Sequence, residues 1–162
     1  MAKMTFSGLA EYERKLTLLS REIKETVAEK TVKAGADIVA DEIRRGIESL
    51  PVITGYGTSE NPLPGGVTAV QKQGLRDSFG ISPMRDDGGT LNVKLGFDGY
   101  NHTKTKQFPK GQPNQLIARA AESGTSWKQK TPFVRPAMTR SRKRAEEKMA
   151  EVLEQEINKI MK

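Results

Sequence analysis

Apolar residues recur three or four positions apart at both ends of the chain, over residues 9–50 and again over residues 139–162. This spacing places them on one face of a helix. We predict a long N-terminal helix, or a helix pair divided near Ser20 or Gly35, and an amphipathic C-terminal helix. A coiled coil is an alternative for the first stretch, although its stripe drifts from a strict heptad. The apolar positions are Leu9, Tyr12, Leu16, Leu19, Ile23, Val27, Ala34, Ile38, Ile43, Ile47, Leu50, Ala145, Met149, Val152, Leu153, Ile157, Ile160 and Met161.

The middle of the chain predicts a small antiparallel sheet with a central hairpin. Residues 79–86 and 90–97 flank the turn-forming residues Asp87–Gly89, an arrangement typical of two paired strands. Apolar and polar residues alternate in the second segment, so one face of that strand is expected to be buried.

Two short helices are also expected. The first covers residues 70–79, although Gly74 weakens its helix propensity. The second covers residues 114–123, with Asn114 as its N-cap and Gly124 as its stop. The predicted fold class is therefore α+β.

The length and composition favour a single domain spanning residues 1–162. The hydrophobic fraction is 35% and the charged fraction is 29%, which indicates a thin core. Residues 51–68 and 98–114 are polar and rich in Pro and Gly, and we expect them to be flexible loops that become ordered in an assembly.

Positive charge is concentrated in one segment. The chain has a net charge of +7, and residues 100–144 contain eleven Lys and Arg against Glu122 alone. Two interpretations stay open: a solvated surface, or a surface that faces DNA or an acidic protein ring. The candidate partner- or DNA-facing residues are Lys104, Lys106, Lys110, Lys128, Lys130, Arg135, Arg140, Arg142, Lys143 and Arg144.

Residues suited to catalysis or metal binding are sparse. The chain has no Cys and a single histidine, His102, so a zinc site built on several His or Cys is not expected. Asp86 and Asp87 belong to the predicted turn, where Asp is favoured for local backbone reasons. The sequence thus predicts no enzyme, metal or cofactor, and no membrane span or export signal.

Two prolines, Pro132 and Pro136, enclose Phe133, Val134 and Arg135. Proline restricts its own φ angle and disfavours helix at the preceding residue. We expect an extended segment that presents Phe133 to the core, with the last helix beginning near Ala137.

Four segments, found in order from EYERKL near the N-terminus to TPFVRPAM at 131–138, resemble the tail-completion or head–tail joining (neck) proteins of long-tailed bacteriophages and prophages. The others are QKQGLRDSFGI at 71–81 and ESGTSW at 122–127. The resemblance covers about residues 6–160. Ser123 departs from the family pattern, which often has an aromatic residue there. The residues that match the family's motifs are Gly74, Leu75, Ser78, Glu122, Gly124, Thr125, Pro132, Phe133, Pro136 and Ala137.

This resemblance implies a structural protein of the virion, at the neck or upper tail, that is present in the host cytoplasm before assembly. It implies a homo-oligomeric ring, expected to be sixfold, that joins the head connector to the tail-tube or terminator proteins while DNA passes through. It implies no small-molecule substrate. The alternatives are a phage or prophage DNA-binding protein, a tail terminator or a minor tail protein.

Overall fold

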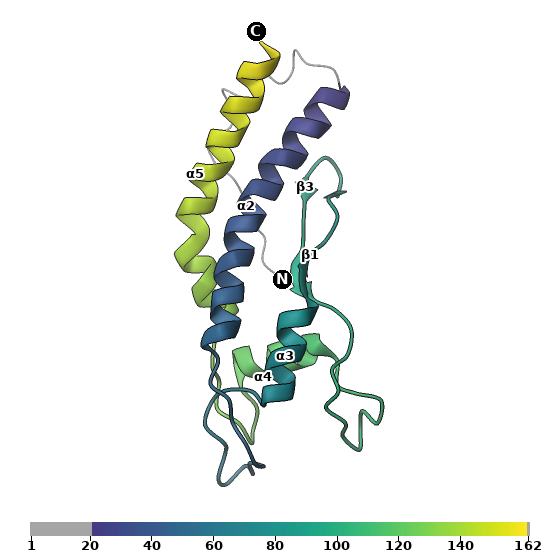
Figure 1. The fold of residues 1–162 in the computed structure, drawn as a ribbon, viewed down its shortest axis with the longest axis vertical. Coiled ribbons are helices and arrows are strands. Elements are labelled where there is room, and N and C mark those ends of the chain that lie inside the picture. The colour runs from purple at the N-terminus through teal and green to yellow at the C-terminus, as the bar shows by residue number, and fades with distance from the viewer. Residues whose placement is uncertain (1–20, 162) are drawn as a thin grey trace.

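The computed structural model describes residues 21–161, which form two long helices, two short helices and two short pairs of antiparallel strands (Figure 1). The long helices, α2 (Arg21–Ser49) and α5 (Val134–Ile160), lie side by side and run in opposite directions. The predicted α+β class is confirmed. The part of the N-terminal stripe that precedes residue 21 lies outside the described residues.

Helix α2 continues through Gly35 instead of dividing there. A Cβ atom at this position would lie only 2.5 Å from the Sδ atom of Met149 on α5. The absence of a side chain therefore allows the two long helices to approach closely, which offsets the low helix propensity of glycine. Within the described residues, no helix is both long and apolar enough to cross a membrane.

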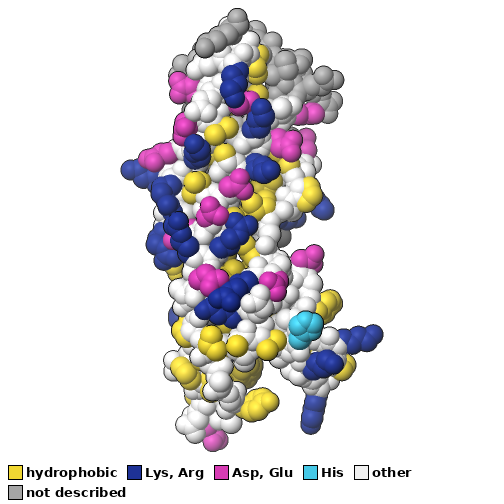
Figure 2. Space-filling view, in the orientation of Figure 1, with side chains coloured by type: hydrophobic (Ala, Val, Ile, Leu, Met, Phe, Trp, Pro, Cys, Tyr) yellow, Lys and Arg dark blue, Asp and Glu magenta, His cyan; other side chains and the backbone are white. Residues whose placement is uncertain are grey.

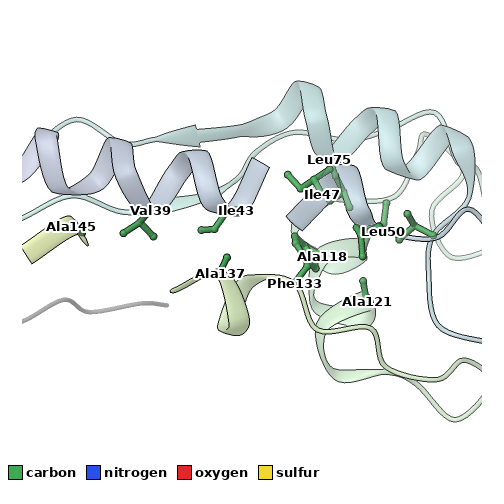
Figure 3. Packing of buried hydrophobic residues seen from close by; sticks show 12 residues of the cluster. Val39, Ile43, Ile47, Leu50, Leu75, Ala118, Ala121, Phe133, Ala137 and Ala145 are labelled. Atoms are coloured by element: carbon green, nitrogen blue, oxygen red, sulfur yellow. The ribbon is translucent and has the colours of Figure 1, made fainter. Parts of the chain in front are cut away.

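The main core lies between α2, α5 and the two short helices (Figure 3). Val39, Ile43 and Ile47 of α2 meet Ala137 and Ala145 of α5, and all five are buried. The predicted apolar face of the last helix is only partly covered, since Leu153 and Ile157 are buried with Val27 whereas Ile160 and Met161 are exposed. The remaining buried members of the main core are Leu50, Val67, Leu75, Ile117, Ala118, Ala121 and Phe133.

The predicted hairpin is present as two consecutive pairs of short strands. Strand β1 (Phe79–Ile81) pairs with β4 (Leu95–Phe97), and β2 (Arg85–Asp86) pairs with β3 (Leu91–Asn92). The turn between β2 and β3 contains two glycines at positive φ, at 88 and 89, a backbone conformation that other residues rarely adopt. Phe79 and Phe97 face each other with ring centroids 5.2 Å apart, which ties the hairpin base to the core.

The two short helices are α3 (Ala69–Ser78) and α4 (Asn114–Ser123). Thr68 and Gln71 form a reciprocal capping box at the start of α3. The expectation that Asn114 caps α4 is wrong, because Pro113 occupies the cap position and the Asn114 side chain donates to the carbonyl of Asp98 at 3.0 Å. Gly124 ends α4 with φ +76°, as predicted.

Helix α5 begins at Val134, not near Ala137. Arg135 is therefore helical, contrary to the expectation that Pro136 would hold it in an extended conformation. Pro136 occupies the third helical position, where an N–H has no intrahelical partner, so its missing donor costs no backbone hydrogen bond.

Candidate functional site

Glu122, at the end of α4, caps the start of α5 with its carboxylate. It accepts hydrogen bonds from the backbone N–H groups of Phe133, Val134 and Arg135 at 2.8, 2.9 and 3.0 Å. A helix N-terminus carries partial positive charge and unpaired N–H groups, which an anion stabilises. Since no Ser, Thr, Asp or Asn caps this helix locally, Glu122 performs that role from a distance in sequence.

A tight reversal brings Glu122 and Phe133 together. Gly124 has a positive φ, and a Cβ atom there would lie 2.9 Å from the backbone nitrogen of Lys130. The N–H of Thr125 donates to the carbonyl of Lys128 at 2.8 Å, and that of Thr131 donates to the carbonyl of Ala121 at 2.7 Å. The motif residues from 122 to 137 thus form one structural joint between α4 and α5.

The apolar half of this joint faces the core. Phe133 is 3% exposed, and its ring meets Phe97 edge-on at a centroid distance of 6.0 Å. Ala137 is fully buried, while Pro132 is exposed at the surface. The position of Phe133 explains why a short apolar segment stands between two prolines.

The motif residues Gly74, Leu75 and Ser78 all lie on α3. Leu75 is fully buried in the core. A Cβ atom on Gly74 would lie 2.7 Å from both the Cβ of Asn101 and the Oδ1 of Asn114. Gly74 therefore permits α3 to pack directly against the segment that connects β4 to α4.

Three buried polar atoms around this contact have no hydrogen-bond partner within residues 21–161. They are Ser78 Oγ, Asn101 Nδ2 and Asn114 Oδ1, and all three residues line one open hollow beside α3. The other polar atoms of the two amides are used: Asn101 Oδ1 accepts from Thr103 N at 2.6 Å, and Asn114 Nδ2 donates to Asp98. The exposed His102 also lines the hollow.

The basic residues on α5 are held in ion pairs. Arg140 Nε and Arg144 Nη2 each contact the Glu42 carboxylate of α2 at 3.0 Å. The hydrogen bond from Arg140 is the largest cause that lowers the pKa of Glu42 below its usual value, followed after opposing desolvation by the bond from Arg144. Because two guanidinium groups share one carboxylate, they clamp α5 onto α2.

Other basic residues of this helix also have acidic neighbours. Arg142 contacts Glu146 at 3.0 Å and Lys143 contacts Glu147 at 3.9 Å, each one helical turn apart, and Arg135 lies 3.9 Å from Glu122. Figure 2 shows Lys and Arg side chains interspersed with Asp and Glu over the long helices. The basic cluster at the start of α5 is therefore part of a mixed-sign surface in the fold.

The remaining candidates lie on loops. Lys104, Lys106, Lys110 and Lys130 are exposed and have no carboxylate partner among the described residues. Lys128 is only 3% exposed, its ammonium group lies 5.6 Å from the centroid of the Trp127 ring, and burial lowers its pKa. The structure thus separates the candidates into a paired group on α5, an unpaired exposed group on loops, and one buried lysine.

Sequence reasoning missed three exposed apolar side chains on the loops that follow α2 and α4, here together named the tip surface: Val52, Tyr56 and Trp127, which are 54%, 101% and 43% exposed. The loops that carry them are joined, because Leu63 N–H donates to the carbonyl of Trp127 and Gln129 N–H to that of Leu63, both at 2.9 Å. The available signal was an aromatic residue, Tyr56, between two loop glycines.

No group of three or more His, Cys, Asp or Glu in the described part of the chain is arranged to hold a metal ion. Asp86 accepts a hydrogen bond from Gly89 N–H at 2.6 Å, as expected for a turn residue. His102 is exposed on its loop.

A protein-family model described as "Bacteriophage HK97-gp10, putative tail-component" matches residues 10–98, which is more than half of the chain. The match includes α2, α3 and the hairpin. No curated protein and no solved structure matches the chain.

Proposed function

The chain belongs to the HK97-gp10-like family, and from that premise we propose that it is a ring-forming subunit that completes the tail and joins it to the head connector. As a member of this family it is a phage tail component with a structural role in the virion. The finer proposal adds a homo-oligomeric ring, a position at the neck or upper tail, and passage of DNA through the ring.

The observation that carries this proposal is the family match over α2, α3 and the hairpin. Two further features support it. The helix pair is elongated (Figure 1), and the Glu42 ion pairs join its two helices, so it suits a rigid wall element. The motif residues at 122–137 maintain the joint between α4 and α5, which is a structural task and not a catalytic one.

A closed ring built by head-to-tail contacts needs two different surfaces on each subunit. The tip surface supplies one of them in this proposal. Large apolar and aromatic side chains that stand exposed on a loop are typical of protein contacts, and Tyr56 is not packed against the core as Phe79, Phe97 and Phe133 are.

The test is to purify the protein, determine its mass in solution by light scattering, and image it by negative-stain electron microscopy. We expect a closed ring, and antibody labelling of the parent virion at the junction of head and tail. A protein that stays monomeric at all concentrations and is absent from purified virions would contradict the proposal.

A matched pair of variants locates the subunit contact. Tyr56→Ser removes an exposed tip aromatic and is expected to shift the ring toward monomer without lowering the melting temperature of the monomer. Tyr100→Ser removes another exposed tyrosine, 71% exposed and outside the tip surface, and should leave the ring intact. Equal behaviour of the two variants would show that the tip surface is not the contact.

A further inference from the structure

We propose that residues 98–114, here named the lysine loop, form the DNA-contacting element of this subunit, and that they bind phosphate groups of duplex DNA without sequence preference. The inference rests on the proposed function, because it assigns to one element the contact with DNA that passes through the ring. It shifts the expected contact away from α5, where the sequence has its densest basic cluster.

The first argument is the availability of charge. Lys104, Lys106 and Lys110 are exposed and lack carboxylate partners among the residues described. The basic residues of α5 instead contact Glu42, Glu146 and Glu147. A lysine that already neutralises a carboxylate must give up that pair to bind phosphate, whereas an unpaired lysine releases only counterions from the DNA.

The second argument is the absence of opposing charge within the loop. Its acidic residue, Asp98, lies at the base, and its side chain accepts a hydrogen bond from Gly99 N–H at 2.7 Å. Asp77 of α3 lines the hollow beside that base. From Gly99 to Asn114 the loop has no carboxylate, so its outer part presents a single sign of charge.

The third argument is internal order. The N–H of Asn101 donates to the carbonyl of Gln112, and that of Gln112 to the carbonyl of Thr103, both at 2.9 Å. In the middle of the loop, Thr105 and Phe108 exchange two backbone hydrogen bonds of 3.1 Å. The loop is thus a cross-linked ribbon, and figures 1 and 2 show it projecting from the body with Lys and Arg side chains at its outer part.

The loop chemistry favours a phosphate backbone over base readout or an acidic protein. Lysines act as point charges that suit phosphate contacts in any sequence. Lys104 and Lys106 alternate with Thr103 and Thr105, whose hydroxyl groups are also common phosphate contacts. Base readout would call for several arginine, asparagine or glutamine side chains directed into a groove, whereas residues 103–111 contain no arginine or asparagine and one glutamine, Gln107. Protein contacts would call for exposed aromatic anchors at the end of the loop, where Phe108 is half-buried instead.

The experiment measures binding of a fluorescent duplex of mixed sequence to the assembled protein over a range of salt concentrations. The variant Lys104→Gln/Lys106→Gln/Lys110→Gln is compared with Arg142→Gln/Lys143→Gln/Lys148→Gln, which removes the same charge from positions on α5 that have acidic partners. The slope of the logarithm of the DNA association constant against the logarithm of the salt concentration is negative, and we expect the loop variant to reduce its magnitude by about 2 to 3. The α5 variant should reduce it by less than about 1.

Equal losses in the two variants would overturn the proposal, because net charge alone would then explain binding. Binding of the unmodified protein to poly-glutamate as tight as its binding to DNA would also overturn it in favour of an acidic protein partner. Ring formation is measured on the same samples. A loop variant that still assembles but loses DNA affinity separates this inference from the proposed ring, which fails only if the unmodified protein does not assemble.

Discussion

Two parts of the basic segment, the lysine loop and the start of α5, are both rich in Lys and Arg or Lys alone, but they differ in whether those side chains have acidic partners in the fold. On α5, Arg140 and Arg144 lie against α2 and share its Glu42, and the helix itself is capped by Glu122. On the loop the lysines face solvent without acidic partners in the described chain. The difference teaches that charge density along a sequence does not measure charge available to a partner.

The reason is geometric. A helix places residues i and i+4 on one face and aligns them with a neighbouring helix, so a basic run there readily meets carboxylates. A projecting loop has no such neighbour. Stability should therefore depend strongly on the α5 region and weakly on the loop, while binding of anions should show the reverse.

The largest expected effect compares two phenylalanines. Phe133→Ala removes a ring that is 3% exposed and in contact with Phe97, and it should lower the free energy of unfolding by about 3–5 kcal/mol. Phe108→Ala removes a half-buried ring from the lysine loop and should cost about 1 kcal/mol. Urea denaturation measures the free energy of unfolding of both variants. If both lose the same amount, the lysine loop contributes as much to stability as the joint between α4 and α5.

The next effect is the loss of the remote cap. Glu122→Ala leaves three N–H groups at the start of α5 without their acceptor, and it should lower stability by about 2 kcal/mol. Glu147→Ala removes an exposed carboxylate from the same helix and should change stability by less than about 0.5 kcal/mol. If thermal melts of the two variants coincide, Glu122 is not a significant cap.

A smaller effect depends on pH. The pKa of Glu42 is held below its usual 4.5, chiefly by the hydrogen bond from Arg140. As the pH falls, Glu42 is therefore protonated in the unfolded chain before it is protonated in the folded protein. The contribution of the Glu42 charge to folding stability is complete above about pH 4.5 and is lost as the pH falls through the folded-state pKa. Glu42→Gln should melt at a lower temperature than the unmodified protein at neutral pH, and the difference in melting temperature should shrink below about pH 4.5.

The matched control is Glu154→Gln, which changes an exposed glutamate on α5. Its melting temperature should follow that of the unmodified protein across the same pH range. A constant difference between Glu42→Gln and the unmodified protein at all pH values would mean that the Glu42 charge does not stabilise the fold.

The smallest expected effect on stability belongs to the lysine loop. The Lys104→Gln/Lys106→Gln/Lys110→Gln variant should change the free energy of unfolding by less than about 0.5 kcal/mol, since surface substitutions without partners are usually near neutral. Chemical denaturation provides the measurement. A loss well above 1 kcal/mol would indicate that these lysines stabilise the subunit, and the contrast with α5 would then disappear.

Local interactions made much of the fold predictable from sequence. The three-and-four spacing identified both long helices, the Asp87–Gly89 turn identified the hairpin, and Gly124 marked the end of α4. Each of these depends on residues close together in the chain. The start of α5 was misplaced because Pro136 fits in a first helical turn, and the role of Asn114 was misassigned because its side chain bonds to Asp98 instead.

The sequence by itself determined the amphipathic helices, the hairpin and the total charge, because these follow from local geometry and composition. Only the tertiary structure decided which charges are used internally. Arg140 and Glu42 are 98 positions apart, and nothing in the spacing of either residue identifies the other. Packing of α2 against α5 brings Glu42 to Arg140 and Arg144, and the reversal between α4 and α5 brings Glu122 to the start of α5. The lysines of the projecting loop have no carboxylate partner in the described part of the chain.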